Sequence, residues 1–494
     1  MYGHKARRCR TYEYGLQVPT AGMDAAVEEM HRRLTLWNAL VEVEHRYREA
    51  VEVVLGERPW AEALADPVSA SHLDGCEAAR RVAEAAAKRA AGLYWCNADE
   101  VVDAYRKARR IKKGAPPPSL HFHRWAGSTG KLQVRYQHGL AVDALSAGDT
   151  RLTVTPTGAR GKRQYGVVRI RASRETWLEA PIILHRPLPA GLIRSAAVLR
   201  TPVGTHASWR LVIVVELPDG AGPAPTGTGA VGIDLGWRRV PSGLRVAAWS
   251  DDRGESGEVV LPQDWIEQHQ KTEDIRSIRD QHFNITRASL ARWLSTAVAV
   301  VPEWLGDATS TLPQWRAPGR LAALTLRWRE NRFPGDDVAY AAAETWRKRD
   351  KHLLEYEANL RDQLLRRRRE LYRVFAAGVA ARYARVRLEV FDIRDVAELP
   401  ETGTGDALPL PVRHNRVLAA PHILRLAVLN ACGRTGVTVE SVSAVNTTHI
   451  CHVCGSLERF DAAEHLSHRC GACGVAWDQD YNAARNLLVG VAQA

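Results

Sequence analysis

The chain has 494 residues, too many for one hydrophobic core, so we expect two to four domains. Its content of 45% hydrophobic and 25% charged residues is typical of a globular protein, and the absence of any run of about 18 apolar residues argues against a membrane span. The net charge of +12 favours a polyanionic partner, with a basic enzyme that has none as the alternative.

The first part of the chain is expected to be helical. Within residues 23–113, Met30, Leu34, Trp37 and Val41 recur at helical spacing and predict the core of a bundle. The segment ends on the basic run RKARRIKKG, for which a solvated helix end and a phosphate-facing surface both stay open. The start of the chain has no apolar signal core, so we expect a cytoplasmic protein.

Short strands joined by Gly-rich turns are expected next, over residues 119–217. Two hairpins are predicted, one with LHFHRW and KLQVRYQH around AGSTG, the other with TRLTVTP and YGVVRIRAS around TGARGKRQ. With the strands APIILHRP and WRLVIVVELP, they indicate a small barrel or sandwich. Basic residues lie among the strand residues and suit phosphate contacts, or else a solvated hairpin tip: Arg135, Arg160, Lys162, Arg163, Arg169 and Arg171.

The Pro- and Gly-rich residues 219–230 predict a linker to a second half. There AVGIDLGWRR and LRVAAWSDD are expected to form paired strands, and long helices are expected near 263–300 and 336–382. The second helix carries Arg366 to Arg369, which favours contact with a nucleic acid backbone over a merely solvated face. Four tryptophans are expected to pack in a core or to stack on bases: Trp304, Trp315, Trp328 and Trp346.

A further helix is expected near 416–432 and a strand at 436–444, followed by paired cysteines. Four of the eight cysteines are scattered singly, so a disulfide framework is not indicated. The other four form two C-x-x-C knuckles, whose thiolates suit a closed tetrahedral zinc site; unligated or redox-active dithiols are the alternative. These predicted zinc ligands are Cys451, Cys454, Cys470 and Cys473.

Two acidic residues occupy the middle of predicted buried strands. In AVGIDLGW, Val231, Ile233 and Leu235 share one face, and Asp234 lies on the other with small neighbours. In VRLEVF, Glu389 is expected to oppose Val386, Leu388 and Val390 in the same way. A buried acid is costly unless it is paired or binds a metal, which indicates a functional pair.

The third acid is expected in DQDYNAARNLLVGVA, where Asp480 would lie one turn before the sheet-facing Ala483 and Ala484. Asp478 is its competitor, and a helix N-cap is the structural alternative for Asp480. Three converging carboxylates repel one another, and two Mg²⁺ ions would relieve that repulsion and organise a phosphodiester for hydrolysis. We therefore predict Asp234, Glu389 and Asp480 as magnesium ligands and catalytic acids.

Together these motifs resemble the split RuvC nuclease domain of TnpB proteins and type V CRISPR effectors. GIDLGW is similar to the first motif, LEVFDI to the second and DQDYNAARNLL to the third, over residues 228–492. A four-cysteine ribbon directly before the third motif is typical of the group. The N-terminal half matches in architecture, and its size favours a compact CRISPR effector over a transposon protein.

The resemblance implies a multidomain α+β protein with a split RNase-H-like domain. Its expected parts are a β-barrel wedge domain (1–18 and 115–218), a helical recognition domain (19–114), a linker (219–230), a RuvC-like domain (231–445 and 477–494) and a zinc ribbon that binds target nucleic acid (446–476).

The resemblance also implies a function in antiviral defence: a guide RNA directs binding of double-stranded DNA beside a short motif, forming an RNA–DNA heteroduplex before magnesium-dependent cleavage. One alternative is a guided DNA-binding protein that cleaves little and acts by occupancy. Others are a TnpB-type nuclease and an unguided RNase-H-like transposase. Monomeric and dimeric forms both stay open.

Overall fold

The computed structural model describes residues 9–56, 58–109, 119–125, 129–149, 151–161, 163–218, 224–297, 301–390, 410–461 and 465–490. The chain divides into two compact units, Met1–Ala221 and Gly222–Ala494, and the division falls inside the segment predicted as a linker. Across the described residues, every helix is too short or too polar to cross a membrane.

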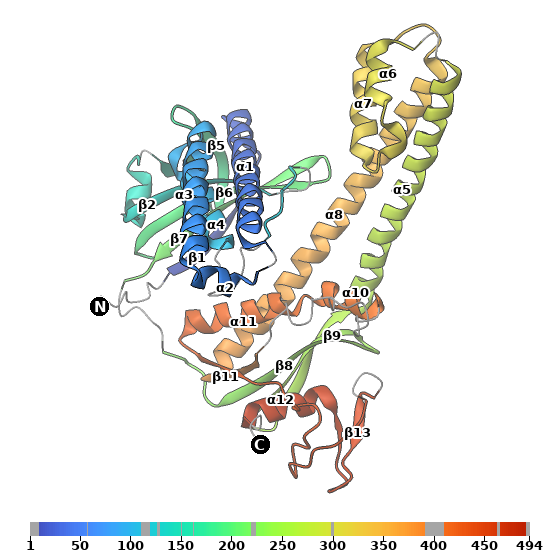
Figure 1. The fold of residues 1–494 in the computed structure, drawn as a ribbon. Coiled ribbons are helices and arrows are strands. Elements are labelled where there is room, and N and C mark those ends of the chain that lie inside the picture. The colour runs from blue at the N-terminus through green and yellow to red at the C-terminus, as the bar shows by residue number, and fades with distance from the viewer. Residues whose placement is uncertain are drawn as a thin grey trace. The chain divides into compact units, whose positions relative to one another are not determined.

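The first unit combines four helices with one antiparallel sheet (Figure 1). Strand β1 (Cys9–Leu16) precedes the helices α1 (Met23–Leu55), α2 (Trp60–Ala65), α3 (Pro67–Ala90) and α4 (Trp95–Ala108). The other strands are β2 (Gly130–Ala141), β3 (Leu152–Arg160), β4 (Arg163–Arg171), β5 (Trp177–Leu184), β6 (Leu192–Val203) and β7 (His206–Glu216). Their order is β2-β6-β7-β1-β5-β4-β3, so β1 lies near the middle. The predicted helical stretch is confirmed as far as Ala108.

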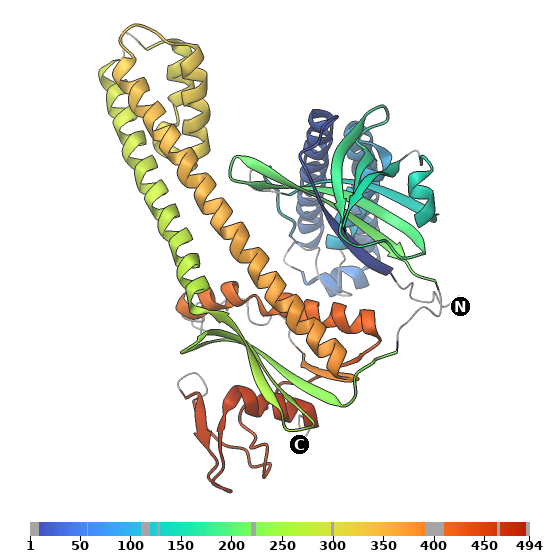
Figure 2. The same cartoon turned by 180° about the vertical axis from the view of Figure 1, so that it is seen from behind.

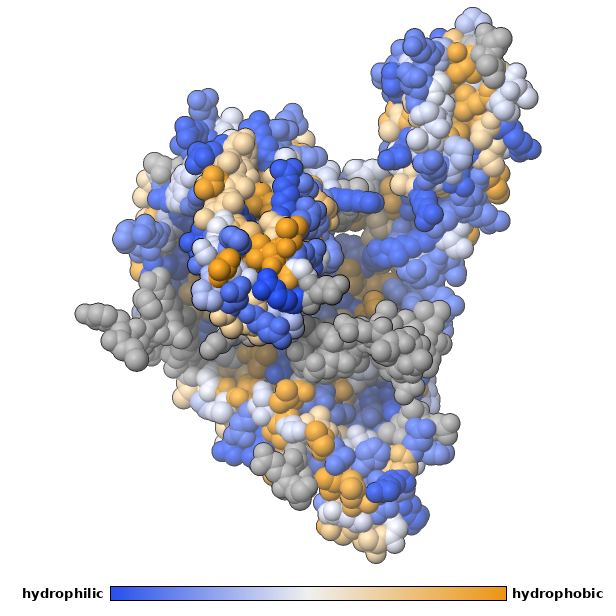
Figure 3. Space-filling model, in the orientation of Figure 1, coloured by the Kyte–Doolittle hydropathy of each residue, from blue (hydrophilic) through white to orange (hydrophobic). Residues whose placement is uncertain are grey.

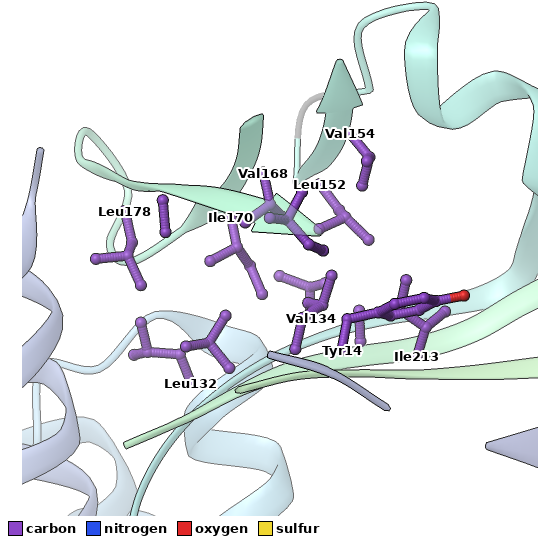
Figure 4. Packing of buried hydrophobic residues seen from close by; sticks show 14 of the residues in the cluster. Tyr14, Leu132, Val134, Leu152, Val154, Val168, Ile170, Leu178 and Ile213 are labelled. Carbon is purple, nitrogen blue, oxygen red and sulfur yellow. The ribbon is translucent and has the colours of Figure 1, made fainter. Parts of the chain in front are cut away.

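Apolar side chains from several strands meet in the core of this unit, as Figure 4 shows. Leu132 of β2, Leu152 of β3 and Ile170 of β4 are fully buried, together with Tyr14 of β1. Burial alternates along β4 and β5, as expected for a sheet with one covered face. Over the helices, Figure 3 shows hydrophobic patches among hydrophilic side chains; α1 and α3 expose Val53, Val68 and Val82.

The sheet is a half-barrel, whereas a small barrel or sandwich was predicted from the strands and a β-barrel wedge domain from the resemblance. Within the described residues, β2 pairs with β6 alone and β3 with β4 alone, so no ladder joins the two end strands. The short helix η1 (Val142–Ser146) packs against both end strands, and α1 and α4 pack against β2. Helices therefore take the place of the strand pairing that would close a barrel.

The first of the two predicted hairpins is wrong, and the second is confirmed. Residues 119–125 form no strand, because α1 side chains satisfy their backbone: Asn38 bonds the amide and carbonyl of His123, and Trp37 Nε1 donates to the His121 carbonyl oxygen. The second hairpin is the antiparallel pair β3–β4, in whose turn Lys162 lies outside the described residues.

The second unit is built on a five-stranded sheet with the order β10-β9-β8-β11-β12. Strands β8 (Ala230–Val240), β9 (Gly243–Asp251) and β10 (Ser256–Pro262) form antiparallel pairs, and the pairing of the first two was predicted. Strands β11 (Arg385–Glu389) and β12 (Thr438–Val442) run parallel to β8. Helices α8 (Asp337–Arg382) and α11 (Pro421–Thr435) bury one face of this sheet.

A long helical arm extends from the sheet (Figures 1 and 2), formed by residues 263–382. Helix α5 (Gln263–Thr296) runs beside α8, and the tip holds α6 (Glu303–Thr309), η2 (Leu312–Gln314) and α7 (Pro318–Glu330). The base-stacking alternative is wrong for three of the four tryptophans, because Trp315, Trp328 and Trp346 are buried in the core of the tip. The fourth, Trp304, is partly buried beside Arg327.

Two expectations at the base of the arm are also corrected. Arg368 of the basic run is buried, because its guanidinium donates to the carbonyl oxygens of Val417 and Leu418. The single helix expected near 416–432 is two helices, α10 (Leu410–Ala419) and α11, because Ala420 is left-handed and Pro421 starts the second helix.

Candidate acid edge and cysteine cluster

Asp234 projects from the central strand of the five-stranded sheet. The apolar residues on either side of it, Ile233 and Leu235, are buried against the helices on the other face. Gly232 shares the face of Asp234, and a Cβ there would lie 2.1 Å from the carbonyl oxygen of Ala484 in α12 (Gln479–Val489). The missing side chain thus lets α12 pack directly on β8.

Glu389 is the last residue of β11, the strand beside β8. Its carboxylate accepts a hydrogen bond of 3.1 Å from the Leu235 amide, which places it next to Asp234. Arg425 of α11 donates to the Glu389 backbone carbonyl at 2.7 Å and fixes this strand end. Val390 is 60% exposed, so its predicted burial is wrong: the strand, and with it the alternation, stops at Glu389.

Asp480 lies in the first turn of α12, and its neighbour Asp478 caps that helix. The Asp478 carboxylate accepts from the amides of Asp480 and Tyr481, at 2.9 Å and 3.4 Å. The N-cap role considered for Asp480 therefore belongs to Asp478. This arrangement places the Asp480 carboxylate near Asp234 at the same sheet edge.

A buried arginine, Arg245 of β9, holds both aspartates. Its Nη1 lies 2.8 Å from Asp480 and 2.8 Å from the nearer oxygen of Asp478, and its Nε donates to Glu258 at 2.6 Å. Arg238 of β8 lies 3.7 Å from the other Asp480 oxygen. Both oxygens of Asp480 therefore face positive charge from the protein itself.

We name Asp234, Glu389 and Asp480 the acid edge. Burial raises the pKa of Asp234 well above its ordinary value, and the nearby charges of Glu389 and Asp480 raise it further. Burial raises the pKa of Glu389 to about 7, against the effects of the Leu235 amide and Arg425. Burial also raises the pKa of Asp480, which Arg245 and Arg238 oppose. The charges of the neighbouring acids thus affect the pKa of Asp234, and the ionised carboxylates together attract a cation.

The fold brings the three predicted acids to one edge of the sheet, but their carboxylate oxygens do not lie close enough together to form one ligand shell. Among the described residues, the groups of three or more Cys, His, Asp or Glu ligand atoms within 4.8 Å of one another comprise the four thiols and no carboxylates. The donor set fits a hard cation such as Mg²⁺, which prefers oxygen. Joint ligation would require Asp480 to leave Arg245.

The four predicted cysteines do converge, and we name them the cysteine cluster. The Sγ–Sγ distances are 3.7 Å for Cys451 and Cys473 and 3.6 Å for Cys454 and Cys470. Sulfurs bound at about 2.3 Å around a tetrahedral zinc lie about 3.8 Å apart. The geometry therefore fits a structural zinc, and a short two-stranded sheet, β13 (Ser467–Arg469) with β14 (Ala476–Asp478), supports the second knuckle.

Two asparagines of α12 hold the first knuckle. Asn482 donates to the carbonyl oxygens of Thr447, Thr448 and Ile450 and accepts from the His452 amide. Asn486 donates to the carbonyl oxygens of Thr447 and Ile450, each at 2.7 Å. The helix that carries Asp480 is thus bound to the cysteine cluster on one side and to β8 on another.

No site role was predicted for Arg245, Arg425, Asn482 or Asn486. Asn482 and Asn486 are four residues apart, so they share a helix face, and this spacing was a usable signal. Nothing local indicates that Arg245 belongs to the site, because the two aspartates that it contacts lie 233 and 235 residues further along the chain.

Similar proteins are found among known sequences and solved structures. The family model "Cas12f1-like, TNB domain" matches residues 424–487. A protein of Thermanaerosceptrum fracticalcis, named CRISPR-associated DNA-binding protein Cas12m, is 42% identical over 81% of this chain and 70% of its own length. A protein of the same name from Allomeiothermus silvanus is 37% identical over 99% of this chain and 98% of its own length. Among solved structures, a Cas12f1–sgRNA–target DNA complex aligns with a TM-score of 0.39 at 10% identity, over 98% of this chain and 99% of that one.

The protein is a compact type V CRISPR effector, which the size of its N-terminal half favoured over a TnpB protein. Within that class, the chain belongs to the Cas12m family.

Proposed function

We propose that this chain is an RNA-guided protein that binds double-stranded DNA and acts mainly by occupying its target. The relatives are named DNA-binding proteins, and the net charge of +12 suits a chain that holds an RNA and a heteroduplex. The observation that favours occupancy over cleavage is the contact between Arg245 and Asp480, because it pairs the third acid with a side chain of the protein itself.

The parts of the chain have proposed roles in this function. The half-barrel is the wedge domain, helices α1–α4 form the recognition domain, and the five-stranded sheet with α12 is the split RuvC domain. The cysteine cluster holds zinc and keeps the ribbon folded beside Asp480, where the ribbon contacts target nucleic acid. The acid edge binds Mg²⁺, with Asp234 and Glu389 as its primary ligands.

Magnesium-dependent DNA cleavage is the second candidate, because Asp234, Glu389 and Asp480 share one sheet edge. Bound Mg²⁺ would supply charge neutralisation at the scissile phosphate and activation of water. The chain would contribute the orientation: the Leu235 amide fixes Glu389, and the N-cap at Asp478 fixes the start of α12. For all three acids to act together, the contact between Asp480 and Arg245 has to break.

The test uses the full-length chain purified with the nucleic acid that accompanies it. Sequencing of that nucleic acid is expected to identify a guide RNA, and the loaded protein is expected to shift a supercoiled plasmid that carries the matching target. With Mg²⁺ present, the plasmid should stay supercoiled. Purification without RNA would contradict guidance. Linear plasmid formed by the wild-type protein but not by the Asp234→Ala variant would support cleavage, the second candidate, instead.

A further inference from the structure

A pocket of about 770 Å³ lies in the first unit, away from the acid edge. It forms where the end of α3, the turn that follows, the start of α4 and the β4–β5 turn meet. Its volume lies in the range of small-ligand sites. We name it the aromatic pocket after Tyr94 and Trp95, which line it.

Trp95 is 49% exposed, which is unusual for the largest apolar side chain. The Arg151 guanidinium lies over its ring, 5.9 Å from the ring centre, and the Tyr94 ring centre is 6.0 Å away. An exposed indole beside cationic groups is a suitable platform for a nucleobase, because every base has a flat face that can stack.

The charged residues of the pocket are arranged on two sides. The last turn of α3 supplies Lys88 and Arg89, and the β4–β5 turn supplies Arg174 and Glu175. Lys88 contacts Asp99 at 2.5 Å, while Arg89 and Arg174 are exposed. The excess of positive charge suits a phosphate, which both arginines can bind through more than one N–H group.

The turn that carries Arg174 and Glu175 is held in place by its own hydrogen bonds. The Ser173 hydroxyl oxygen accepts from the amides of Glu175 and Thr176, and Arg171 donates to the Arg174 carbonyl oxygen at 2.9 Å. A carboxylate such as that of Glu175 repels phosphate but accepts a hydrogen bond from a hydroxyl. The ribose 2′-hydroxyl is a donor that deoxyribose lacks.

We propose that the aromatic pocket binds one unpaired ribonucleotide of the guide RNA. The base stacks on Trp95, the phosphate lies between Arg89 and Arg174, and the 2′-hydroxyl donates to Glu175. This inference deepens the proposed function and rests on it, because it assigns one guide-binding site to residues of the first unit.

The test measures binding of the full-length chain, stripped of nucleic acid, to the RNA that copurifies with it and to a DNA oligonucleotide of the same sequence. Trp95→Ala is expected to weaken RNA binding about 5- to 100-fold, and Trp95→Phe, which keeps a stacking ring, by no more than about threefold. Arg89→Gln is expected to weaken binding and to lower its salt dependence. Arg81→Gln is the matched control on α3, because Arg81 is 73% exposed and paired with Glu77.

The outcomes separate this inference from the proposed function. A smaller preference for RNA over DNA in Glu175→Ala would support the ribose contact, and an unchanged preference in that variant would overturn the assignment to a ribonucleotide. Unchanged RNA binding by a folded Trp95→Ala variant would overturn the pocket alone, provided that the wild-type chain binds RNA. A wild-type chain that binds no RNA would overturn the proposed function as well.

Discussion

Arg245 decides how strongly the acid edge can attract a cation, because its charge lies against the carboxylate of Asp480. A unit charge a few ångströms away changes the free energy of cation binding by about 1 to 2 kcal/mol even where water screens it. We therefore expect Arg245→Gln to bind Mg²⁺ on the order of tenfold more tightly, as measured by calorimetry. Since Arg245 opposes the raised pKa of Asp480, its removal raises that pKa further, and the comparison is made over a series of pH values so that protonation of the carboxylate is separated from the loss of the arginine.

Arg239→Gln is the matched control for this prediction, because Arg239 lies on β8 in the same unit but contacts Asn415 and no acid of the edge. Its Mg²⁺ affinity should equal that of the wild type. An affinity for Mg²⁺ that is unchanged or weaker in Arg245→Gln would mean that the arginine holds Asp480 in place for the ion and does not compete with it.

At the scale of elements, the contact between α12 and β8 depends on one missing side chain. A Cβ on Gly232 would clash with the backbone of Ala484, which cannot move independently of its helix. Gly232→Ala is expected to lower the free energy of unfolding by about 1 to 3 kcal/mol, as overpacking does, and to shift α12 away from the acid edge. Gly236→Ala on the same strand has no atom within 4 Å of its new Cβ and should leave stability nearly unchanged. Equal denaturation midpoints for the two variants would contradict this packing.

The cysteine cluster should stabilise α12 as well as the ribbon, because Asn482 and Asn486 join the helix to the first knuckle. We expect Cys470→Ser to lose the bound zinc and to raise hydrogen exchange in both the ribbon and α12, since structural zinc supplies folding free energy directly. Cys76→Ser, at a cysteine outside the cluster, is the control and should keep one zinc per chain by metal analysis. Faster exchange in the ribbon alone would show that α12 holds its place without the metal.

Some features of these elements could be predicted from the sequence, and others could not. The faces of β8 followed from local alternation, and the cysteine pairs from their spacing, because both signals lie within a few residues. The half-barrel and the burial of Arg368 did not follow, because each depends on contacts between distant segments, whereas the α10–α11 break had a local signal in Pro421. Asp480 itself was predictable from the helix pattern, whereas its engagement by Arg245 was not, because only the folded sheet brings β9 to the start of α12.

For the whole molecule, the positive charge predicts nucleic acid binding that weakens steeply with salt, because each phosphate contact releases a counterion. Arg160 and Arg163, at the exposed β3–β4 turn, are candidates for such contacts. The double variant Arg160→Gln/Arg163→Gln is expected to weaken DNA binding by the RNA-loaded protein to a similar degree for every target sequence. It should also reduce the slope of log K against log salt by about 2, since each phosphate contributes about 0.9.

The control replaces Arg32 and Arg46 of α1, which are paired with Glu28 and Glu42, and should keep the wild-type slope. An unchanged slope in the hairpin variant would assign the electrostatic contacts to other surfaces, whereas a loss confined to one target sequence would indicate that these arginines read bases.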